Sequence, residues 1–432
     1  MPIPPGAAAR LAAAKVLYAV LKSRRTLDDT LAVTPDFKAL KGPDRAFARA
    51  MISAALRHLG RIDAVVMPIV TRPGKTLSPE VAALLRIGAA QLWVLDTPGH
   101  AAVGETVAAA KAWPVTQPAS GLVNAVLRRA IDARANFDAV AAMGAWPGWL
   151  QADLRRSLGD GAAEALAEIQ LEQPDLHLTV PRLTPARAQQ LGGAEIVPGT
   201  VVVVPGDVGQ LPGYEDGDWW VQDVAAALAV RVLAPQPKEV IFDLCAAPGG
   251  KTMQLAAAGA HVIAVDRSKP RLKRVRENLA RTGLGEQVEV VAADLETWTP
   301  PRKADAILLD APCSALGTLR RHPEGAWIKS SSDVARFSAI QARMLAATRD
   351  WLAPGGRLVY CVCTPRPQEG KDIVDAACGD QGWQRLPVLP EEAVGFETAI
   401  TALGDLLTLR QPASAEAPFH HDAFFVSRVT RS

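Results

Sequence analysis

The sequence lacks any apolar run approaching the roughly 18 residues that a membrane-spanning helix requires. This absence excludes a helical integral membrane protein. The alanine-rich start of the chain is interrupted by Arg10 and Lys15, and no small-residue cleavage site follows a clean apolar stretch. We therefore expect a soluble protein that is not exported.

Cysteine is scarce, with five residues among 432. An odd number of cysteines in a long chain without an export signal argues against a disulfide framework and indicates a reducing compartment, the cytoplasm. Cys361 and Cys363 form a Cys-x-Cys pair, but no second pair and no suitably spaced histidine accompanies them. We therefore expect no metal site.

An excess of charge is also absent overall, because the formal net charge is only +2. The charges are nevertheless unevenly spread. Residues 1–62 carry eleven Lys and Arg against four Asp, and residues 267–281 carry seven basic residues against one acid. Either segment alone could be a solvated helix face, but two separated basic segments indicate a polyanionic partner with at least two contact surfaces.

The length predicts two or three domains. Helical periodicity dominates the start of the chain, so we expect an all-α domain at residues 1–140. A small α+β module is expected at 145–215. From 216 to 432, strands and helices alternate in the βαβ manner that builds a parallel, Rossmann-like α/β sheet.

The expected elements follow from apolar spacing and from Pro and Gly punctuation. In the first part, helices are expected at 11–21, 47–59, 81–95, 101–112 and 121–131. After a connector at 145–148, a charged helix is expected at 150–171. In the module, strands at 176–180 and 201–204 flank a helix at 184–191, with Thr184 as its N-cap. In the last part, strands are expected at 239–244, 261–266, 288–292, 306–309, 357–360 and 423–429, and helices at 251–258, 270–282 and 335–352.

The sharpest local signal is the segment 243–252, in which a strand runs into a Gly-rich turn and then a helix. A P-loop would need glycine where Cys245 stands, and the Gly-x-Gly-x-x-Gly spacing of a dinucleotide fold is absent. What remains is a turn that can bind a small ligand at the N-terminus of a helix. Asp266, at the end of the second strand, is placed to accept ribose hydroxyls, and Asp294, after the third, to meet an adenine amino group; each could instead merely cap the next helix.

Two cysteine-bearing segments follow later strands of the expected sheet. Asp310-Ala311-Pro312-Cys313-Ser314 comes at the end of the fourth strand, and Cys361-Val362-Cys363-Thr364-Pro365 at the end of the fifth. Parallel sheets bind ligands at the carboxyl ends of their strands. A lone cysteine there is usually structural, whereas two such loops beside an adenosine site favour cysteine chemistry.

These motifs resemble a known family. Residues 220–430 resemble the RNA cytosine-5 methyltransferases that use S-adenosylmethionine, through 243–252, 265–268, 271–283, Asp294, 310–314, 320–323 and 360–367. Residues 1–135 resemble a NusB-type RNA-binding domain, through 88–92, 98–103, Glu105 and 119–128. The resemblance covers nearly the whole chain, and the fusion of both parts is similar to bacterial methyltransferases of small-subunit ribosomal RNA.

The resemblance implies roles for individual residues. Cys363 would attack carbon 6 of cytosine, Cys313 would assist release, and Asp310 would contact the amino and ring-nitrogen edge of the base. The basic helix 270–282 and Arg320-Arg321 are candidate phosphate contacts. The residues implied to line the S-adenosylmethionine site are Cys245, Ala246, Ala247, Pro248, Gly249, Gly250, Lys251, Asp266, Arg271, Asp294 and Asp310.

The expected partner is small-subunit ribosomal RNA, free or in an assembling particle, and we expect a monomer. Two other functions stay open. A DNA cytosine-5 methyltransferase would attack through the cysteine of Pro312-Cys313 and need no second cysteine. A non-catalytic RNA-binding or assembly factor would keep the cofactor site only as a relic.

Overall fold

The computed structural model describes residues 4–70, 77–409 and 419–431. These residues form two units, one made of 1–173 with 319–331 and the other of 174–318 with 332–432. The predicted division into three parts, residues 1–140, 145–215 and 216–432, stays a prediction. None of the helices in the described part of the chain has the length and apolar character needed to cross a membrane.

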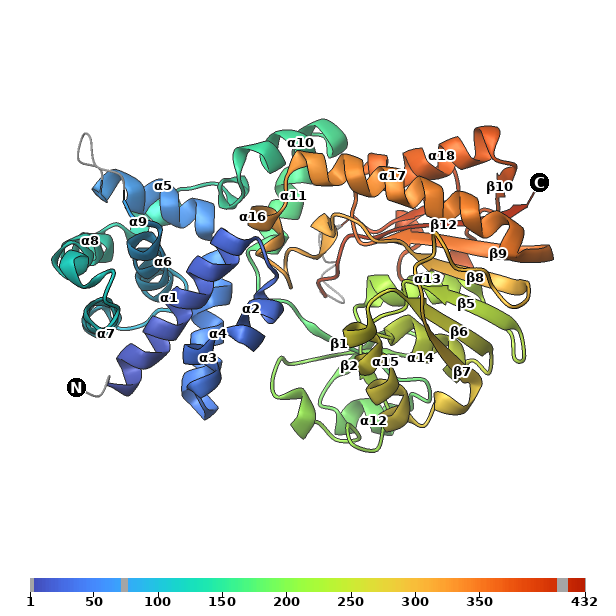
Figure 1. The fold of residues 1–432 in the computed structure, drawn as a ribbon, viewed down its shortest axis with the longest axis horizontal. Coiled ribbons are helices and arrows are strands. Elements are labelled where there is room, and N and C mark those ends of the chain that lie inside the picture. Colours follow the sequence, from blue (N-terminus) through green and yellow to red (C-terminus); the bar gives the residue numbers. More distant parts are fainter. Residues whose placement is uncertain (1–3, 71–76, 410–418, 432) are drawn as a thin grey trace. The chain divides into compact units, whose positions relative to one another are not determined.

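The first unit is helical, as the periodicity predicted (Figure 1). Its helices are α1 (Pro5–Ser23), α2 (Leu27–Val33), α3 (Pro35–Ala39), α4 (Gly42–Arg57), α5 (Leu59–Val70), α6 (Pro79–Trp93), α7 (Gly99–Ala112), α8 (Ser120–Asp132), α9 (Arg134–Asp138), α10 (Gly148–Leu158), α11 (Asp160–Gln170) and α16 (Gly325–Ile328). Helix α1 packs against α4, α6 and α7. Its alanines at 7, 9, 12, 13 and 14 are fully buried, and their small side chains let neighbouring helices approach closely.

The expected single helix at 150–171 is wrong. The structure divides it into α10 and α11 at Gly159, which has a φ of 81°. An α-helix requires negative φ, and only glycine adopts this conformation without strain. The break lets α10 and α11 pack against each other within the first unit.

Residues 319–331 belong to the helical unit although, in sequence, they lie between two strands of the large sheet of the second unit. The Glu324 carboxylate accepts the backbone N–H of Leu27 at 3.1 Å, and Arg57 Nη2 donates to the carbonyl of Arg320 at 2.9 Å. Arg320 is only 1% exposed. Its predicted phosphate contact is therefore wrong, because its guanidinium is buried in protein.

The second unit contains a small antiparallel sheet in the order β2-β3-β1-β4. Its strands are β1 (Leu176–Thr179), β2 (Ala194–Val197), β3 (Thr200–Val203) and β4 (Trp220–Val221). Helix α12 (Pro185–Gln190) begins after Thr184, whose side chain accepts the N–H of Arg187 at 3.2 Å. The predicted N-cap is confirmed, since a cap satisfies an N–H group that the helix leaves free.

The large sheet has the order β10-β12-β9-β8-β5-β6-β7, and β11 pairs with β12. Its strands are β5 (Val240–Leu244), β6 (His261–Asp266), β7 (Val288–Ala292), β8 (Ala304–Asp310), β9 (Leu352–Val362), β10 (Trp383–Arg385), β11 (Leu406–Leu407) and β12 (Phe425–Arg431). Strands β5 to β9 are parallel, whereas β12 runs antiparallel to β9. The sheet is thus Rossmann-like but mixed, and the expectation that all of it is parallel is corrected at β10 to β12.

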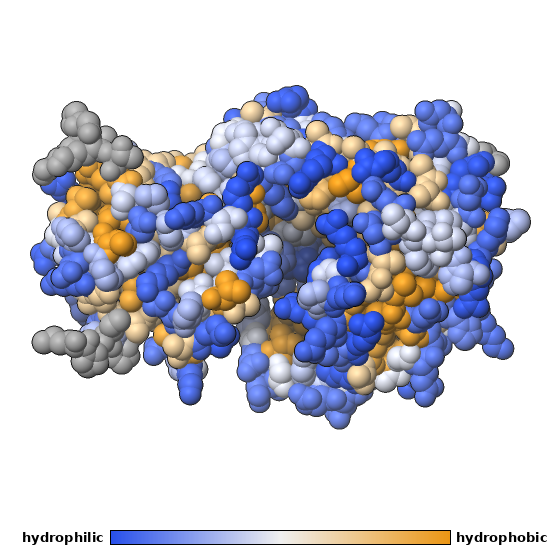
Figure 2. All heavy atoms as spheres, in the orientation of Figure 1, coloured by the Kyte–Doolittle hydropathy of each residue, from blue (hydrophilic) through white to orange (hydrophobic). Residues whose placement is uncertain are grey.

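Helices cover both faces of this sheet. They are α13 (Val224–Leu233), α14 (Gly250–Ala257), α15 (Lys269–Thr282), α17 (Ser331–Thr348) and α18 (Lys371–Asp380). Alternation along the strands divides the core: Ile241 packs in a cluster with Leu228 of α13, and its neighbour Phe242 in the opposite cluster with Leu345 of α17. On the face seen in Figure 2, hydrophilic side chains predominate and apolar ones form scattered patches. The order of β8, β5 and β6 makes a topological switch point beside β5, where such sheets bind ligands.

Candidate active site

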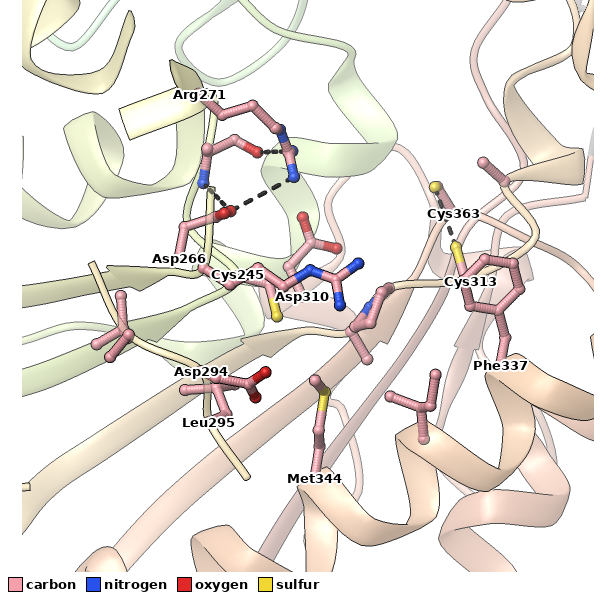
Figure 3. A pocket seen from close by; sticks show the side chains of 18 residues that line it. Cys245, Asp266, Arg271, Asp294, Leu295, Asp310, Cys313, Phe337, Met344 and Cys363 are labelled. Carbon is pink, nitrogen blue, oxygen red and sulfur yellow. Dashed lines mark hydrogen bonds and ion pairs between the residues drawn. The ribbon is translucent and has the colours of Figure 1, made fainter. Parts of the chain in front are cut away.

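A cavity of about 240 Å³ opens at the carboxyl ends of the strands of the second unit (Figure 3). Its walls come from the turn after β5, the ends of β6 and β8, the loops after β7 and β9, and helix α17. The lining residues that the sequence predicted are Cys245, Ala247, Asp266, Arg271, Asp294, Asp310, Cys313 and Cys363. Segments separated by more than a hundred residues thus meet in one site.

The Gly-rich turn is shaped by backbone conformation. Gly249 has a φ of 105°, and a Cβ there would lie 3.2 Å from a methyl group of Val275. The backbone conformation therefore favours glycine at this position, and the close approach of α15 leaves little room for a side chain. Ala246, Pro248, Gly249, Gly250 and Lys251 do not line the cavity, although they were predicted to contact the cofactor.

Asp266 ties the turn to helix α15. Its carboxylate accepts the N–H groups of Ala247 at 3.2 Å and Ser268 at 2.8 Å. Arg271 Nη1 lies 3.4 Å from Asp266 Oδ2, and its Nη2 donates to the carbonyl of Ala247 (Figure 3). Arg271 therefore positions the turn and the acid, whereas its direct contact with the cofactor stays a prediction.

Lys251 forms an ion pair with Asp310, which lines the cavity. Lys251 Nζ lies 2.8 Å from Asp310 Oδ2, and the ammonium sits 5.2 Å from the centre of the Phe424 ring. Lys251 is only 8% exposed, and the nearby carboxylates raise its pKa despite its burial. The ammonium therefore stays charged and faces Asp310, not solvent.

A second acid, Asp243, stabilises the Gly-rich turn. Asp243 lies near the end of β5, is fully buried and accepts the Thr252 hydroxyl at 2.5 Å. Burial raises the pKa of its carboxyl to about 7. The hydrogen bond fastens strand β5 to the first turn of α14 across the Gly-rich turn.

The two predicted cysteines meet directly. The Sγ atoms of Cys313 and Cys363 lie 3.3 Å apart, and both thiols are free (Figure 3). The hydrogen bond to Cys363 and burial raise the pKa of Cys313 well above its ordinary value, so it carries its proton at neutral pH. Cys361 is fully buried with its Sγ 3.6 Å from Asp310 Oδ1, and it packs behind the acid.

Sequence reasoning missed the apolar side of the cavity, formed by Leu295, Phe337, Ile340 and Met344. The last three lie on α17 at spacings of three and four residues, the signature of one helix face. That pattern could have been found, because the helix itself was expected. Arg281 corrects another expectation: its guanidinium donates to the carbonyls of Tyr214 and Trp219, so it supports the fold instead of facing a phosphate.

Comparison with known proteins decides the family. The ribosomal RNA small subunit methyltransferase B of Xanthomonas campestris pv. campestris is 38% identical over 388 residues, covering 86% of this chain and 87% of its own. The chain belongs to the RsmB/F methyltransferase family. Residues 230–430 match the family described as 16S rRNA methyltransferase RsmB/F, and residues 7–132 match the NusB family. The relative of the same name in Pseudomonas syringae pv. tomato is 38% identical over 394 residues, covering 85% of this chain and 86% of its own.

Solved structures share the fold of this chain. PH0851 superimposes with a TM-score of 0.73 at 22% identity over 100% of both chains. NSun6 from Pyrococcus horikoshii superimposes with a TM-score of 0.56 at 18% identity, covering 66% of this chain and 98% of its own. The predicted all-α NusB-like part and the Rossmann-like methyltransferase part are confirmed.

As an RsmB/F member the protein is a methyltransferase that uses S-adenosylmethionine. The cavity fits this group in the chemistry of its donors. Asp266 at the end of β6 and Asp294 after β7 offer acceptors for ribose hydroxyls and an adenine amino group, and Leu295 and Phe337 offer apolar surface for the ring. Three carboxylates, with Asp310, also suit a sulfonium cation. The contacts of Asp266, Asp294 and Asp310 with the cofactor stay predictions.

Proposed function

We propose that the protein methylates carbon 5 of a cytidine in small-subunit ribosomal RNA through a covalent bond between Cys363 Sγ and carbon 6 of the base. The observation that carries this proposal is the contact of Cys313 and Cys363 beside Asp310, in the wall of a cofactor cavity. The curated relatives act, by name, on small-subunit ribosomal RNA.

The chemistry explains why two cysteines are needed. Carbon 5 of cytosine is a poor nucleophile, and a thiolate added to carbon 6 pushes electron density onto it. S-adenosylmethionine supplies, when bound, an electrophilic methyl group. Release then requires two proton movements: the Cys313 thiol gives its proton to the departing Cys363 sulfur, and the proton on carbon 5 passes to Cys313. The electron pair of that carbon–hydrogen bond restores the ring as the bond between Cys363 and carbon 6 breaks. Cys313, at 3.3 Å from Cys363, is placed to assist this release.

Asp310 is placed to hold the base during attack. It lines the cavity, and Lys251 fixes its Oδ2. We assign its other oxygen to the amino and ring-nitrogen edge of cytosine. The base must leave its stack to reach this site, at a cost of a few kcal/mol that is smallest in single-stranded or looped RNA.

The proposal is tested by identifying the product. Purified protein, an unmodified transcript of small-subunit ribosomal RNA and S-adenosylmethionine carrying a labelled methyl group are incubated, and the RNA is digested to nucleosides. We expect the label in 5-methylcytidine. Label in another nucleoside, or in DNA but not RNA offered in competition, would contradict the proposal. We also propose that the protein acts in the reducing cytoplasm and that it acts as a monomer. Its substrate is either free ribosomal RNA or an assembling particle.

We further predict that the exposed basic side chains of α15 bind the RNA backbone. Lys269 and Arg274 are exposed, and Arg271 on the same helix lines the cavity. Replacing both Lys269 and Arg274 by Ala is expected to weaken RNA binding and to lower the slope of log K against log salt concentration by about 1 per residue.

The matched control replaces Arg302 and Lys303 by Ala, two exposed basic residues just before β8, at the edge of the sheet opposite the site. Binding is measured by fluorescence anisotropy at several salt concentrations, and S-adenosylmethionine binding is expected to stay unchanged in both variants. Equal losses of affinity in the two double variants would show a general effect of charge and reject the α15 surface.

A further inference from the structure

The side chain of Glu369 is fully buried beside the cysteine loops, on the segment that follows Cys363. Its Oε1 accepts the backbone N–H of Ser314 at 2.7 Å, and its Oε2 accepts the Ser314 hydroxyl at 2.5 Å. A carboxylate that accepts two bonds from one residue fixes both the position and the orientation of that residue. Ser314 directly follows Cys313, so this clamp acts on the cysteine loop.

Gln341 of α17 extends the clamp to the other side of Cys313. Its Nε2 donates to the carbonyl of Pro312 at 2.9 Å and lies 3.3 Å from Glu369 Oε1. The residues before and after Cys313 are therefore both held by one buried network. Such networks have few alternative arrangements, because each broken bond would leave a buried polar group unsatisfied.

The same network reaches the loop of the second cysteine. The hydroxyl groups of Ser314 and Thr364 lie 3.2 Å apart, and Thr364 directly follows Cys363. The Tyr360 hydroxyl donates to the carbonyl of Glu369 at 2.5 Å and so fixes the backbone that carries the carboxylate. The 3.3 Å separation of the two sulfur atoms is thus set by residues that do not line the cavity.

We infer that Glu369 is a positioning residue for release: through Ser314 it holds Cys313 against Cys363, and it does not touch the RNA or the cofactor. This inference rests on the proposed covalent mechanism. In that mechanism Cys363 attacks alone, whereas its departure needs Cys313 in place. Loss of the clamp should therefore slow release more than attack.

The test measures attack and release separately. Wild type, Glu369→Ala and Glu369→Gln are mixed with the RNA and S-adenosylmethionine, and the covalent adduct is followed on denaturing gels over time. We expect Glu369→Ala to release RNA at least tenfold more slowly and to accumulate adduct. Glu369→Gln is expected to release within about threefold of wild type, because its amide can accept the Ser314 N–H and donate to the Ser314 hydroxyl.

Glu391→Ala is the matched control, because Glu391 is exposed in the same unit. A merely structural role for Glu369 would lower adduct formation, methylation and S-adenosylmethionine binding together, and that result would overturn the inference. If Glu369→Ala does not fold, Ser314→Ala decides. It removes the hydroxyl contacts with Glu369 and Thr364 and keeps the backbone N–H bond to Glu369, so accumulation of adduct supports the clamp and release at the wild-type rate rejects it.

Cys313→Ala separates this inference from the function on which it rests. If that variant forms no adduct with RNA, the covalent mechanism itself is rejected. If it forms adduct while Glu369→Ala releases RNA at the wild-type rate, only the role of Glu369 is rejected.

Discussion

Cys313→Ala is expected to leave the protein attached to its RNA, whereas Cys363→Ala is expected to abolish both attachment and methyl transfer. Cys363 supplies the bond to carbon 6, and without it carbon 5 is not activated, so activity should fall below about 10⁻⁴ of wild type. Without Cys313 the attack can still occur, but the partner that lies 3.3 Å from the attacking sulfur is missing at release. A slowly migrating RNA band on a denaturing gel reports the adduct.

Cys378→Ala is the control for this experiment, since Cys378 lies in α18 and does not line the cavity. It should behave as wild type. An adduct that requires Cys313 instead of Cys363 would favour the Pro-Cys nucleophile of the DNA enzymes. Absence of both adduct and methylation in the wild type would favour a non-catalytic RNA-binding factor.

Asp310→Asn is expected to lower kcat by about 10² to 10³, the usual effect of removing one charged contact that strengthens in a transition state. The carboxylate lies between Lys251 and Cys361 and faces the cavity. In the proposed mechanism it stabilises the protonated ring-nitrogen edge of the cytosine. Asparagine keeps the shape but carries no charge. Single-turnover methylation rates and S-adenosylmethionine binding by calorimetry measure the two effects separately.

The control is Asp305→Asn, at the other end of the same strand β8, where the carboxylate accepts the N–H of Val240 at 2.8 Å. This bond can be kept by the amide oxygen, so little change in rate is expected. If Asp310→Asn weakens S-adenosylmethionine binding as much as it lowers the rate, the acid belongs chiefly to the cofactor site and its assignment to the base is wrong.

The local pattern of apolar residues accurately predicted the strands that build the site. Strands β6 and β7 begin and end where the sequence placed them, because alternating or continuous apolar residues bounded by Gly and polar residues leave little freedom. The antiparallel direction of β12 was missed, since alternation along one strand carries no information about the direction of its neighbour. The break at Gly159 was missed because a glycine within a periodic helix is often tolerated.

The sequence by itself determined which residue types end the parallel strands: the acids after β6, β7 and β8 and the two cysteine loops. Parallel strands necessarily bring their carboxyl ends to one edge, so these residues had to gather. Only the tertiary structure decided how they meet. It buried Arg320 in the helical unit, turned Lys251 toward Asp310 and placed the Glu369 clamp on Ser314. Such contacts join residues distant along the chain through side-chain packing and hydrogen bonds, and no local periodicity encodes them.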